Sequence, residues 1–373
     1  MAASDVPPRI VLFGATGYTG RLTARALVDR GARPVLAGRD ADRLAGLGAE
    51  LGGLDTAVAD VSRVQTISAL LGPGDVLIST VGPFARYGAS AVTAAVTAGA
   101  HYLDSTGEAP FIRRVFTEYG PRATGSALLT AFGYDFVPGN LAGALALAQA
   151  PSAVRVDIGY FVTGAANAGG MSSGTRASGV GMMLAPHHAF RGGRIVTEPS
   201  ARHVRAFPVG NRVGNRSQPA ASIGGTEPYT LPRIAPQLTD VRVYLGWFGP
   251  ATRLLQALSV GMSVLTKLPG AAGAVHSALR PLTRSTGTGP APEARARNGS
   301  RVVAVCSDAS GRELATVQVA GVDAYDFTAR VLAWSAEQLA AGAVAGTGAL
   351  GPVDAFGLDA LERGCAEAGI ARV

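Results

Sequence analysis

The sequence is poor in cysteine and lysine, and both shortages exclude whole classes of site. Only two of the 373 residues are cysteine, Cys306 and Cys365, and they lack the C-x-x-C spacing of zinc or redox sites. We expect both to be small buried hydrophobic residues rather than a disulfide. Lys267 is the only lysine, and Leu268 follows it, which excludes a Walker phosphate loop. Ser263 stands four positions earlier, so the Tyr-x-x-x-Lys pair of short-chain dehydrogenases is absent too.

Charge and long apolar runs are also scarce. Only 16% of the residues are charged, and the net charge of +7 is carried almost wholly by arginine. Basic residues are not interleaved with aromatic ones, so we expect no nucleic acid partner. The histidines lack ligand spacing, which predicts no metal site. Neither a signal peptide nor a membrane-spanning run is visible, and we therefore expect a cytoplasmic protein.

The first part of the chain alternates short apolar runs with alanine-rich helical runs. This pattern is typical of an α/β fold with a Rossmann-type, doubly wound parallel sheet. The expected strands are Arg9–Phe13, Pro34–Ala37, Thr56–Ala59, Val76–Thr80, His101–Leu103 and Leu128–Ala131. The expected helices are Thr19–Arg30, Asp40–Leu51, Val64–Leu71, Ala89–Ala98 and Pro110–Tyr119.

The pattern changes after Pro151, which places a Rossmann domain over residues 1–150 and a second, α+β domain over residues 151–350. Residues 190–238 are rich in Gly, Pro, Arg and Ser and are expected to be mostly loop. Further expected elements are a strand at Val154–Val162, helices at Ser173–Leu184, Ala251–Leu268 and Ala324–Ala341, and a β-hairpin of Arg301–Ser307 with Glu313–Val319.

A glycine-rich segment separates the first strand from the first helix. Its spacing, G-x-x-G-x-x-G, is a variant of the dinucleotide-binding fingerprint. Glycines let the backbone approach a pyrophosphate, and the helix N-terminus then presents N–H groups to the anion. The predicted cofactor-binding residues here are Gly14, Thr16, Gly17, Tyr18, Thr19 and Gly20.

The end of the second strand indicates which dinucleotide is bound. An NAD site usually has an acid there, whereas this chain has Gly38 followed by Arg39, and an arginine accommodates a 2′-phosphate. We therefore predict NADP(H), with Arg43 as a second contact, while Asp40 caps the next helix. Asp60 either lies near the adenine or caps the helix that follows it.

Three polar loops follow the fourth, fifth and sixth strands and should meet at one sheet edge, beside the nicotinamide. The predicted cofactor contacts here are Thr80, Val81, Gly82, Pro83, Phe84 and Asp104. Tyr87, Tyr134 and Asp135 are the candidate proton donors, and the sequence does not choose among them. The alternative is that Asp104 and Asp135 cap helices and that Tyr87 packs.

These motifs resemble the saccharopine dehydrogenase-like oxidoreductases, in particular the branch that contains the actinobacterial trans-acting enoyl reductases. The resemblance rests on Gly14–Gly20, Ala37–Arg39, Val81–Phe84 with Tyr87-Gly88, Tyr102–Glu108 and Gly133–Pro138. It implies NADP(H), a Rossmann domain, a smaller α+β domain whose sheet often supports a homodimer, and a C-terminal tail, residues 351–373, that returns to the Rossmann domain. In that branch the enzymes reduce C=C bonds of polyketide-type lipid intermediates, and other branches handle C=N or C–N bonds.

Three functions remain open. The first is an NADPH-dependent reductase of a C=C bond in an apolar enoyl substrate, which would be carried as a thioester. The second is an imine (C=N) reductase, and the third is a non-catalytic NADP-binding regulatory protein. Residues 247–268 are apolar and would line a substrate tunnel, rest on a membrane surface, or form a core helix. Arginines between 191 and 216 either meet an acidic carrier protein or belong to a solvated loop.

Overall fold

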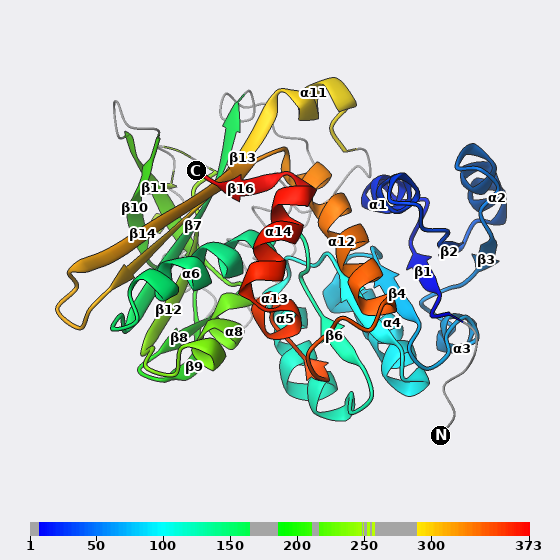
Figure 1. Cartoon of the computed structure of the whole chain (residues 1–373), viewed down its shortest axis with the longest axis horizontal. Helices are drawn as coiled ribbons and strands as arrows, with labels where there is room; N and C mark the ends of the chain where they lie inside the picture. The colour runs from blue at the N-terminus through cyan, green and yellow to red at the C-terminus, as the bar shows by residue number, and fades with distance from the viewer. Residues whose placement is uncertain are drawn as a thin grey trace, which may run out of the picture. The chain divides into compact units, whose positions relative to one another are not determined.

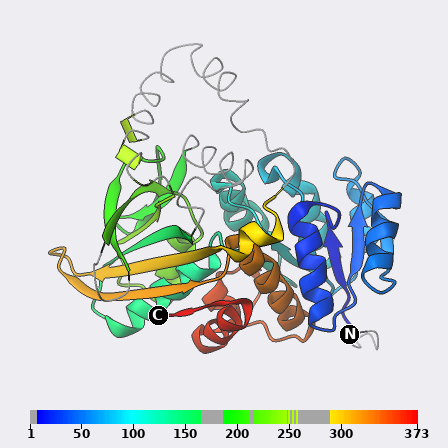
Figure 2. The ribbon, with the colours of Figure 1, turned by 90° about the horizontal axis from the view of Figure 1, so that it is seen from above.

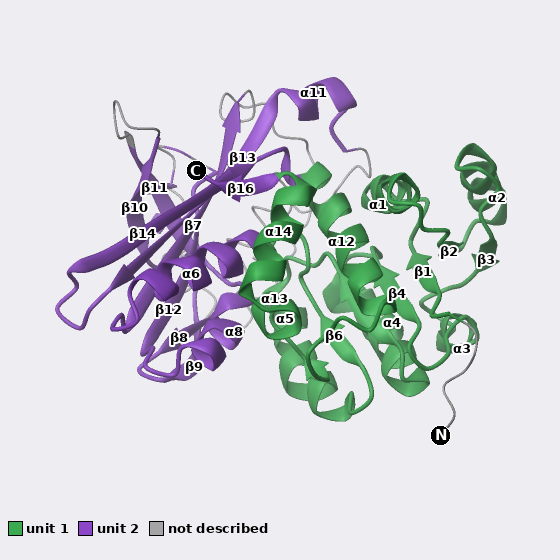
Figure 3. Cartoon of the chain, in the orientation of Figure 1, with its two compact units in different colours: residues 1–137, 325–369 green, residues 138–324, 370–373 purple. Residues whose placement is uncertain are grey.

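The chain folds into two compact units (Figure 3). The computed structural model describes residues 7–164, 186–210, 216–247, 249, 252–253, 256–257 and 289–373. The first unit comprises Met1–Val137 and Tyr325–Gly369, and the second comprises Pro138–Ala324 and Ile370–Val373.

A parallel sheet of seven strands forms the centre of the first unit (Figure 1). Its order is β15-β6-β5-β4-β1-β2-β3, and every neighbouring pair in it is parallel. Apart from β15 at the edge, this is the strand order 3-2-1-4-5-6 of a Rossmann fold, which confirms the predicted fold class. The strands are β1 (Ile10–Phe13), β2 (Val35–Gly38), β3 (Thr56–Val58), β4 (Val76–Ser79), β5 (His101–Asp104), β6 (Ala127–Leu129) and β15 (Gly348–Ala349).

Helices connect these strands and cover the sheet (Figure 1). Because both faces are covered, the central strands β1 and β4 are buried along their whole length, which explains their continuous apolar sequences. The helices are α1 (Tyr18–Asp29), α2 (Ala41–Glu50), α3 (Val64–Ser68), α4 (Phe84–Ala98), α5 (Ala109–Arg114), η1 (Val115–Tyr119), η2 (Gly120–Arg122), α12 (Ala324–Ala340), α13 (Pro352–Phe356) and α14 (Leu358–Ala368).

A mixed sheet of nine strands dominates the second unit. Its main path is β10-β11-β12-β7-β13-β14-β16, and β8 and β9 extend it from β12. The strands are β7 (Arg155–Gly164), β8 (His187–Arg191), β9 (Arg194–Glu198), β10 (Val204–Val209), β11 (Arg216–Ile223), β12 (Asp240–Leu245), β13 (Asn298–Ser307), β14 (Glu313–Gly321) and β16 (Ile370–Arg372). The helices are α6 (Val137–Gln149), α8 (Glu227–Ile234) and α11 (Pro292–Ala296).

The predicted strand at Val154–Val162 and the predicted hairpin are both present, as β7 and as the pair β13–β14 (Figure 2). The expectation that residues 190–238 are mostly loop was wrong, because β9, β10, β11, α8 and the end of β8 lie there. Gly192 and Gly193 have φ values of 55° and 76° and form the tight turn between β8 and β9. Turn glycines, and arginines such as Arg191 and Arg205 that pair with acidic residues within the sheet, account for the loop-like composition.

The domain boundaries also differ from the expected ones. The first segment of the first unit ends at Val137 rather than at residue 150. The chain returns to this unit at Tyr325, so that most of α12 belongs to it. The C-terminal tail divides, because β16 pairs with β14 in the second unit. The helix expected at 173–184 and nearly all of the apolar stretch 247–268 lie outside the described residues. Among those residues, no helix has the length and apolarity needed to cross a membrane.

Candidate functional site

The glycine-rich segment forms a tight loop at the carboxyl end of β1. The backbone N–H groups of Gly14 and Ala15 donate to the carbonyl of Ala37 on β2, at 2.8 and 3.2 Å. Gly17 precedes α1 and donates to the carbonyl of Gly14 at 2.9 Å. Among the described residues no side chain caps α1, and its first turn holds no acidic residue. The partial positive charge at this end of α1 is therefore available to an anion.

The loop is packed so tightly that a side chain would not fit at two of its glycines. Gly14 has a φ of +89°, and a Cβ on it would lie 2.7 Å from Oγ1 of Thr80. A Cβ on Gly20 would lie 2.9 Å from the Cα of Ala15. Thr80 in turn donates to the carbonyl oxygens of Phe13 and Gly14, at 3.2 and 3.1 Å. This close packing of backbone on backbone fits the cradle that a pyrophosphate needs.

A pocket beside the loop contains the two arginines predicted to select the cofactor. Its lining residues are Thr16, Arg39, Asp40 and Arg43. Nη2 of Arg43 donates to the carbonyl of Thr16 at 3.0 Å, so this side chain joins α2 to the phosphate loop. Asp40 accepts the N–H of Arg43 at 3.0 Å, which confirms that it caps α2. Two exposed guanidinium groups next to a dinucleotide loop are suited to a 2′-phosphate.

Asp60 follows β3 and forms a local turn. Its carboxylate accepts hydrogen bonds from the N–H and the hydroxyl of Ser62, both at 2.8 Å. These bonds, with a smaller contribution from the charge of Arg39, hold the pKa of Asp60 below its usual value. Asp60 is therefore an anion within the electrostatic field of the arginine pocket. Its contact with adenine stays a prediction.

The loop after β4 is shorter than the sequence pattern suggested. Helix α4 begins at Phe84 rather than at residue 89, and Tyr87 therefore lies in its first turn. The Phe84 ring is 6% exposed and packs against Phe111 at a centroid distance of 5.8 Å. Thr80, Val81, Gly82 and Pro83 remain as the loop at the predicted nicotinamide side, and the Gly82–Pro83 peptide is cis.

Glu108 is a residue of this region that the sequence pattern did not single out. Its carboxylate accepts the N–H groups of Phe84 and Ala85, at 2.7 and 2.9 Å, and so caps α4 from the loop after β5. Its own N–H donates to Oγ1 of Thr106 at 3.0 Å. A Glu in a neighbouring loop has no fixed spacing from the helix that it caps, so sequence offers no signal for it.

Asp104, at the end of β5, is fully buried. Its carboxylate accepts the N–H of Thr106 at 2.9 Å, the N–H of Ala131 at 2.8 Å and the hydroxyl of Thr130 at 2.7 Å. Burial is the largest effect on this group and raises its pKa to about 6, although these hydrogen bonds oppose the shift. We therefore assign Asp104 to holding two loops together, in place of the direct cofactor contact that its position predicts.

The three candidate proton donors have different surroundings. Tyr87 is partly exposed, and the guanidinium of Arg86 lies 4.9 Å from the centre of its ring. Tyr134 is 2% exposed. Asp135 is partly exposed, but burial of its carboxyl alone raises the pKa to about 7. Burial thus favours the neutral, proton-donating form of the Asp135 carboxyl, whereas a solvated aspartate is ionised at neutral pH.

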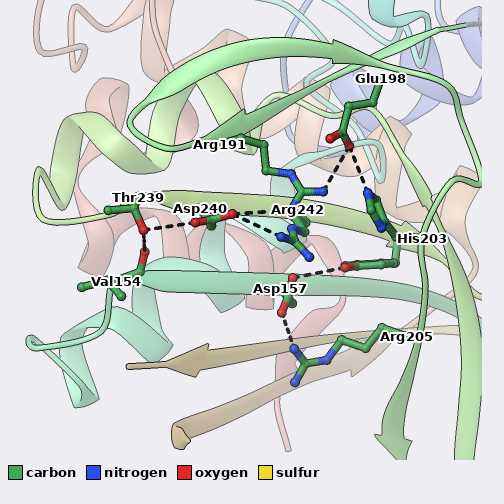
Figure 4. A network of polar contacts seen from close by, with 10 residues as sticks. Val154, Asp157, Arg191, Glu198, His203, Arg205, Thr239, Asp240 and Arg242 are labelled. Carbon is green, nitrogen blue, oxygen red and sulfur yellow. Dashed lines mark hydrogen bonds and ion pairs between the residues drawn. The ribbon is translucent and has the colours of Figure 1, made fainter. Parts of the chain in front are cut away.

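A network of charged residues lies on the sheet of the second unit (Figure 4). Arg205 pairs with the buried Asp157 and, at 2.8 Å, with Glu313. Arg191 pairs with Glu198 at 3.2 Å and with Asp240 at 3.5 Å. Two of the arginines considered for docking an acidic partner are therefore engaged within the sheet. The described residues hold no cluster of three or more metal-ligating side chains.

Part of the sequence is similar to a known protein family and to named bacterial proteins. Residues 10–128 match the family model described as "Saccharopine dehydrogenase NADP binding domain". Proteins named trans-acting enoyl reductase from Mycobacterium tuberculosis and Mycobacterium leprae are each 41% identical over 140 residues, 35% of this chain and 34% of theirs. The corresponding protein of Mycobacterium ulcerans is 38% identical over 149 residues, 38% of this chain and 36% of its own. The chain thus spans about a third of the length of the curated relatives it matches.

One solved structure is similar over almost the whole chain. It is apo histidine-tagged saccharopine dehydrogenase (L-Glu forming) from Saccharomyces cerevisiae, with a TM-score of 0.58 and 12% identity, covering 98% of this chain and 99% of the other. At this identity the similarity concerns the fold. The family model over residues 10–128 confirms the predicted resemblance and the NADP cofactor. Residues 10–128 are thus similar to the saccharopine dehydrogenase NADP binding domain, and the chain has the fold of saccharopine dehydrogenase.

Proposed function

We propose that this chain is an NADPH-dependent reductase of the C=C bond of an apolar, α,β-unsaturated thioester of the polyketide or lipid type. The observation that carries the choice of substrate is the 41% identity, over 140 residues, to a protein named trans-acting enoyl reductase. NADPH, when bound, supplies a hydride to the β-carbon. The glycine loop and the Arg39–Arg43 pocket would hold its pyrophosphate and its 2′-phosphate.

The reduction also needs a proton at the α-carbon, and we assign its delivery to Asp135. As negative charge develops on the thioester carbonyl and the α-carbon, a neutral carboxyl can release its proton to that carbon. The desolvated environment of Asp135 keeps a fraction of the carboxyl neutral near pH 7. The charge that remains on the carboxylate is neutralised when a proton returns from solvent.

The test uses Asp135→Asn with NADPH and a trans-2-enoyl N-acetylcysteamine thioester. The proposal predicts that kcat of the wild type falls as the pH rises above about 7, since the protonated acid is required. The variant should lose about 10²–10⁴-fold in kcat and also lose this pH dependence. Tyr87→Phe serves as the matched comparison, because it removes a proton donor from α4.

Each other outcome points to a different function. Full turnover of Asp135→Asn with an unchanged pH profile would remove Asp135 as the donor. Turnover of cyclic imines in place of enoyl thioesters would favour the imine reductase. Tight binding of NADPH with turnover of neither substrate class would favour the regulatory protein.

A further inference from the structure

Helix α12 contacts both of the loops on which the candidate site is built. Tyr325, near its start, packs edge-on against Tyr18 of the phosphate loop, with ring centroids 5.0 Å apart and planes at 89°. Thr328 accepts the backbone N–H of Tyr134 at its Oγ1, at 3.0 Å. Residues three apart lie on the same face of a helix. One face of α12 therefore supports the phosphate loop and the loop that carries Asp135.

The contact between Thr328 and the Asp135 loop, residues 130–137, is a close approach of backbone to side chain. A Cβ on Gly133 would lie 2.8 Å from Cγ2 of Thr328 and 2.9 Å from its Oγ1. These distances are below those of ordinary packing, so a side chain at this point would displace either the loop or Thr328. The loop therefore follows the surface of α12 so closely that its position depends on Thr328.

The rest of the Asp135 loop is fixed at its ends. Asp104 binds the N–H of Ala131 through its carboxylate and the N–H of Phe132 through its carbonyl, at 2.8 and 2.7 Å. Phe136 donates to the carbonyl of Ala131 at 2.7 Å, and Val137 donates to that of Gly133 at 3.0 Å. Thr328 holds the middle of the loop, at the residue that precedes Asp135.

We propose that Thr328 is a positioning residue for Asp135, which acts by fixing the Tyr134 N–H and with it the place of the adjacent carboxyl. The proposal rests on the function assigned to Asp135 above. A buried N–H that loses its acceptor tends to move toward water or to another acceptor, and the loop moves with it. Thr328→Val puts a methyl group in place of the hydroxyl and so removes the acceptor of the Tyr134 N–H.

The experiment compares Thr328→Val with Thr328→Ser, which retains the hydroxyl. Carbon-13 NMR of protein labelled at aspartate follows the titration of the Asp135 carboxyl, whose signal is assigned by its loss in Asp135→Asn. For Thr328→Val we expect the titration midpoint to fall by about one unit or more, toward that of a solvated Asp. For Thr328→Ser we expect it to stay at the wild-type value. This readout needs neither substrate nor cofactor.

Activity supplies the second readout, in the assay with NADPH and the enoyl thioester. Misplacement of a reacting group by about 1 Å lowers kcat by up to about 10²-fold. We expect a loss of about 10–100-fold in kcat for Thr328→Val, recovery in Thr328→Ser, and a dissociation constant for NADPH within about twofold of the wild type.

An unchanged Asp135 titration in Thr328→Val, in a protein that remains folded by near-ultraviolet circular dichroism, would overturn the proposal. If that variant fails to fold, Gly133→Ala displaces the same contact from the loop side, and the same fall in the midpoint is expected. A shifted titration combined with full activity of Asp135→Asn would retain the positioning by Thr328 and remove the role of Asp135 as proton donor. The two proposals can therefore fail separately.

Discussion

The carboxylate of Asp104, at the end of β5, accepts the backbone N–H of Ala131, just beyond β6, at 2.8 Å. Neighbouring parallel strands end at the same sheet edge, and this bond joins the loops that leave two of them. Glu108 makes a similar connection between the loop after β5 and the start of α4. The loops at the predicted nicotinamide side thus hold one another in place, which is the preorganisation that the proposed hydride transfer needs.

The buried carboxyl of Asp104 should make stability depend on pH. Its pKa is raised to about 6, so the folded state favours the neutral form. Its contribution is fully present below the unfolded pKa of about 4 and is lost as the pH rises through about 6. We expect the unfolding free energy of the wild type, relative to that of Asp104→Asn, to fall by about 2–3 kcal/mol between pH 4 and pH 7.5. Urea unfolding at several pH values measures it.

Asp308, on the β13–β14 turn, is a control of opposite sign. Hydrogen bonds from Ser310 lower its pKa, so its contribution is present above its unfolded pKa and is lost as the pH falls. Asp308→Asn should therefore lose its difference from the wild type at low pH. A constant difference between wild type and Asp104→Asn over the whole range would contradict the burial of Asp104.

Two glycine substitutions should have opposite effects on stability. Gly14→Ala places a side chain at φ +89° and against Thr80, which should destabilise the fold by at least about 1–2 kcal/mol and weaken nucleotide binding. Gly46 is exposed on α2, with nothing within 4 Å of a Cβ, so Gly46→Ala should stabilise the fold by about 0.5–1 kcal/mol. Thermal unfolding with and without NADPH measures both. Equal effects of the two changes would argue against the close packing of the loop.

The ion pair of Arg205 with Asp157 should contribute more to the unfolding free energy than the ion pair of Arg205 with Glu313. Asp157 is 2% exposed, and burial raises its pKa while Arg205 opposes the shift. Asp157→Ala leaves Arg205 and the hydroxyl of Tyr244 without their buried partner. Because a quarter of Arg205 is exposed, we expect a loss of about 2–4 kcal/mol in urea unfolding.

Glu313→Gln is the matched control for Asp157→Ala, because Glu313 is 60% exposed and binds the same guanidinium. Its effect should stay below about 1 kcal/mol. If Glu313→Gln proved as destabilising as Asp157→Ala, burial would not be the reason for the strength of the Asp157 pair.

The first unit was predictable because local sequence determines most of it. A glycine loop between a strand and a helix, and an arginine at the end of the second strand, are short-range signals with a direct physical meaning, and Arg39 indeed lies beside Thr16. The continuous apolar runs predicted the parallel strands, because a sheet covered by helices on both sides buries both of its faces.

The features that were missed depend on residues far apart in the chain. Thr328 meets Tyr134, and Glu108 caps a helix that begins at Phe84, although neither pair has a spacing that a sequence pattern reveals. Ala131 has a φ of 54°, an uncommon conformation for alanine that hydrogen bonds to Asp104 help to hold. The strands from β8 to β11 were missed because turn glycines and surface arginines weaken the alternation of their sequences.

The central claim, that the first unit holds NADP(H) with its 2′-phosphate at Arg39, has one direct test. The protein is titrated with NADPH and with NADH, and both titrations are repeated on Arg39→Ala and on Arg33→Ala. Arg33 is the control, because in the wild type its guanidinium donates to the carbonyl of Gly53. Loss of a charged contact of about 1.5–3 kcal/mol predicts about 10–100-fold weaker NADPH binding for Arg39→Ala, with NADH binding unchanged and Arg33→Ala equal to the wild type. Binding of NADPH and NADH with equal affinity to the wild type, or of neither, would contradict the claim.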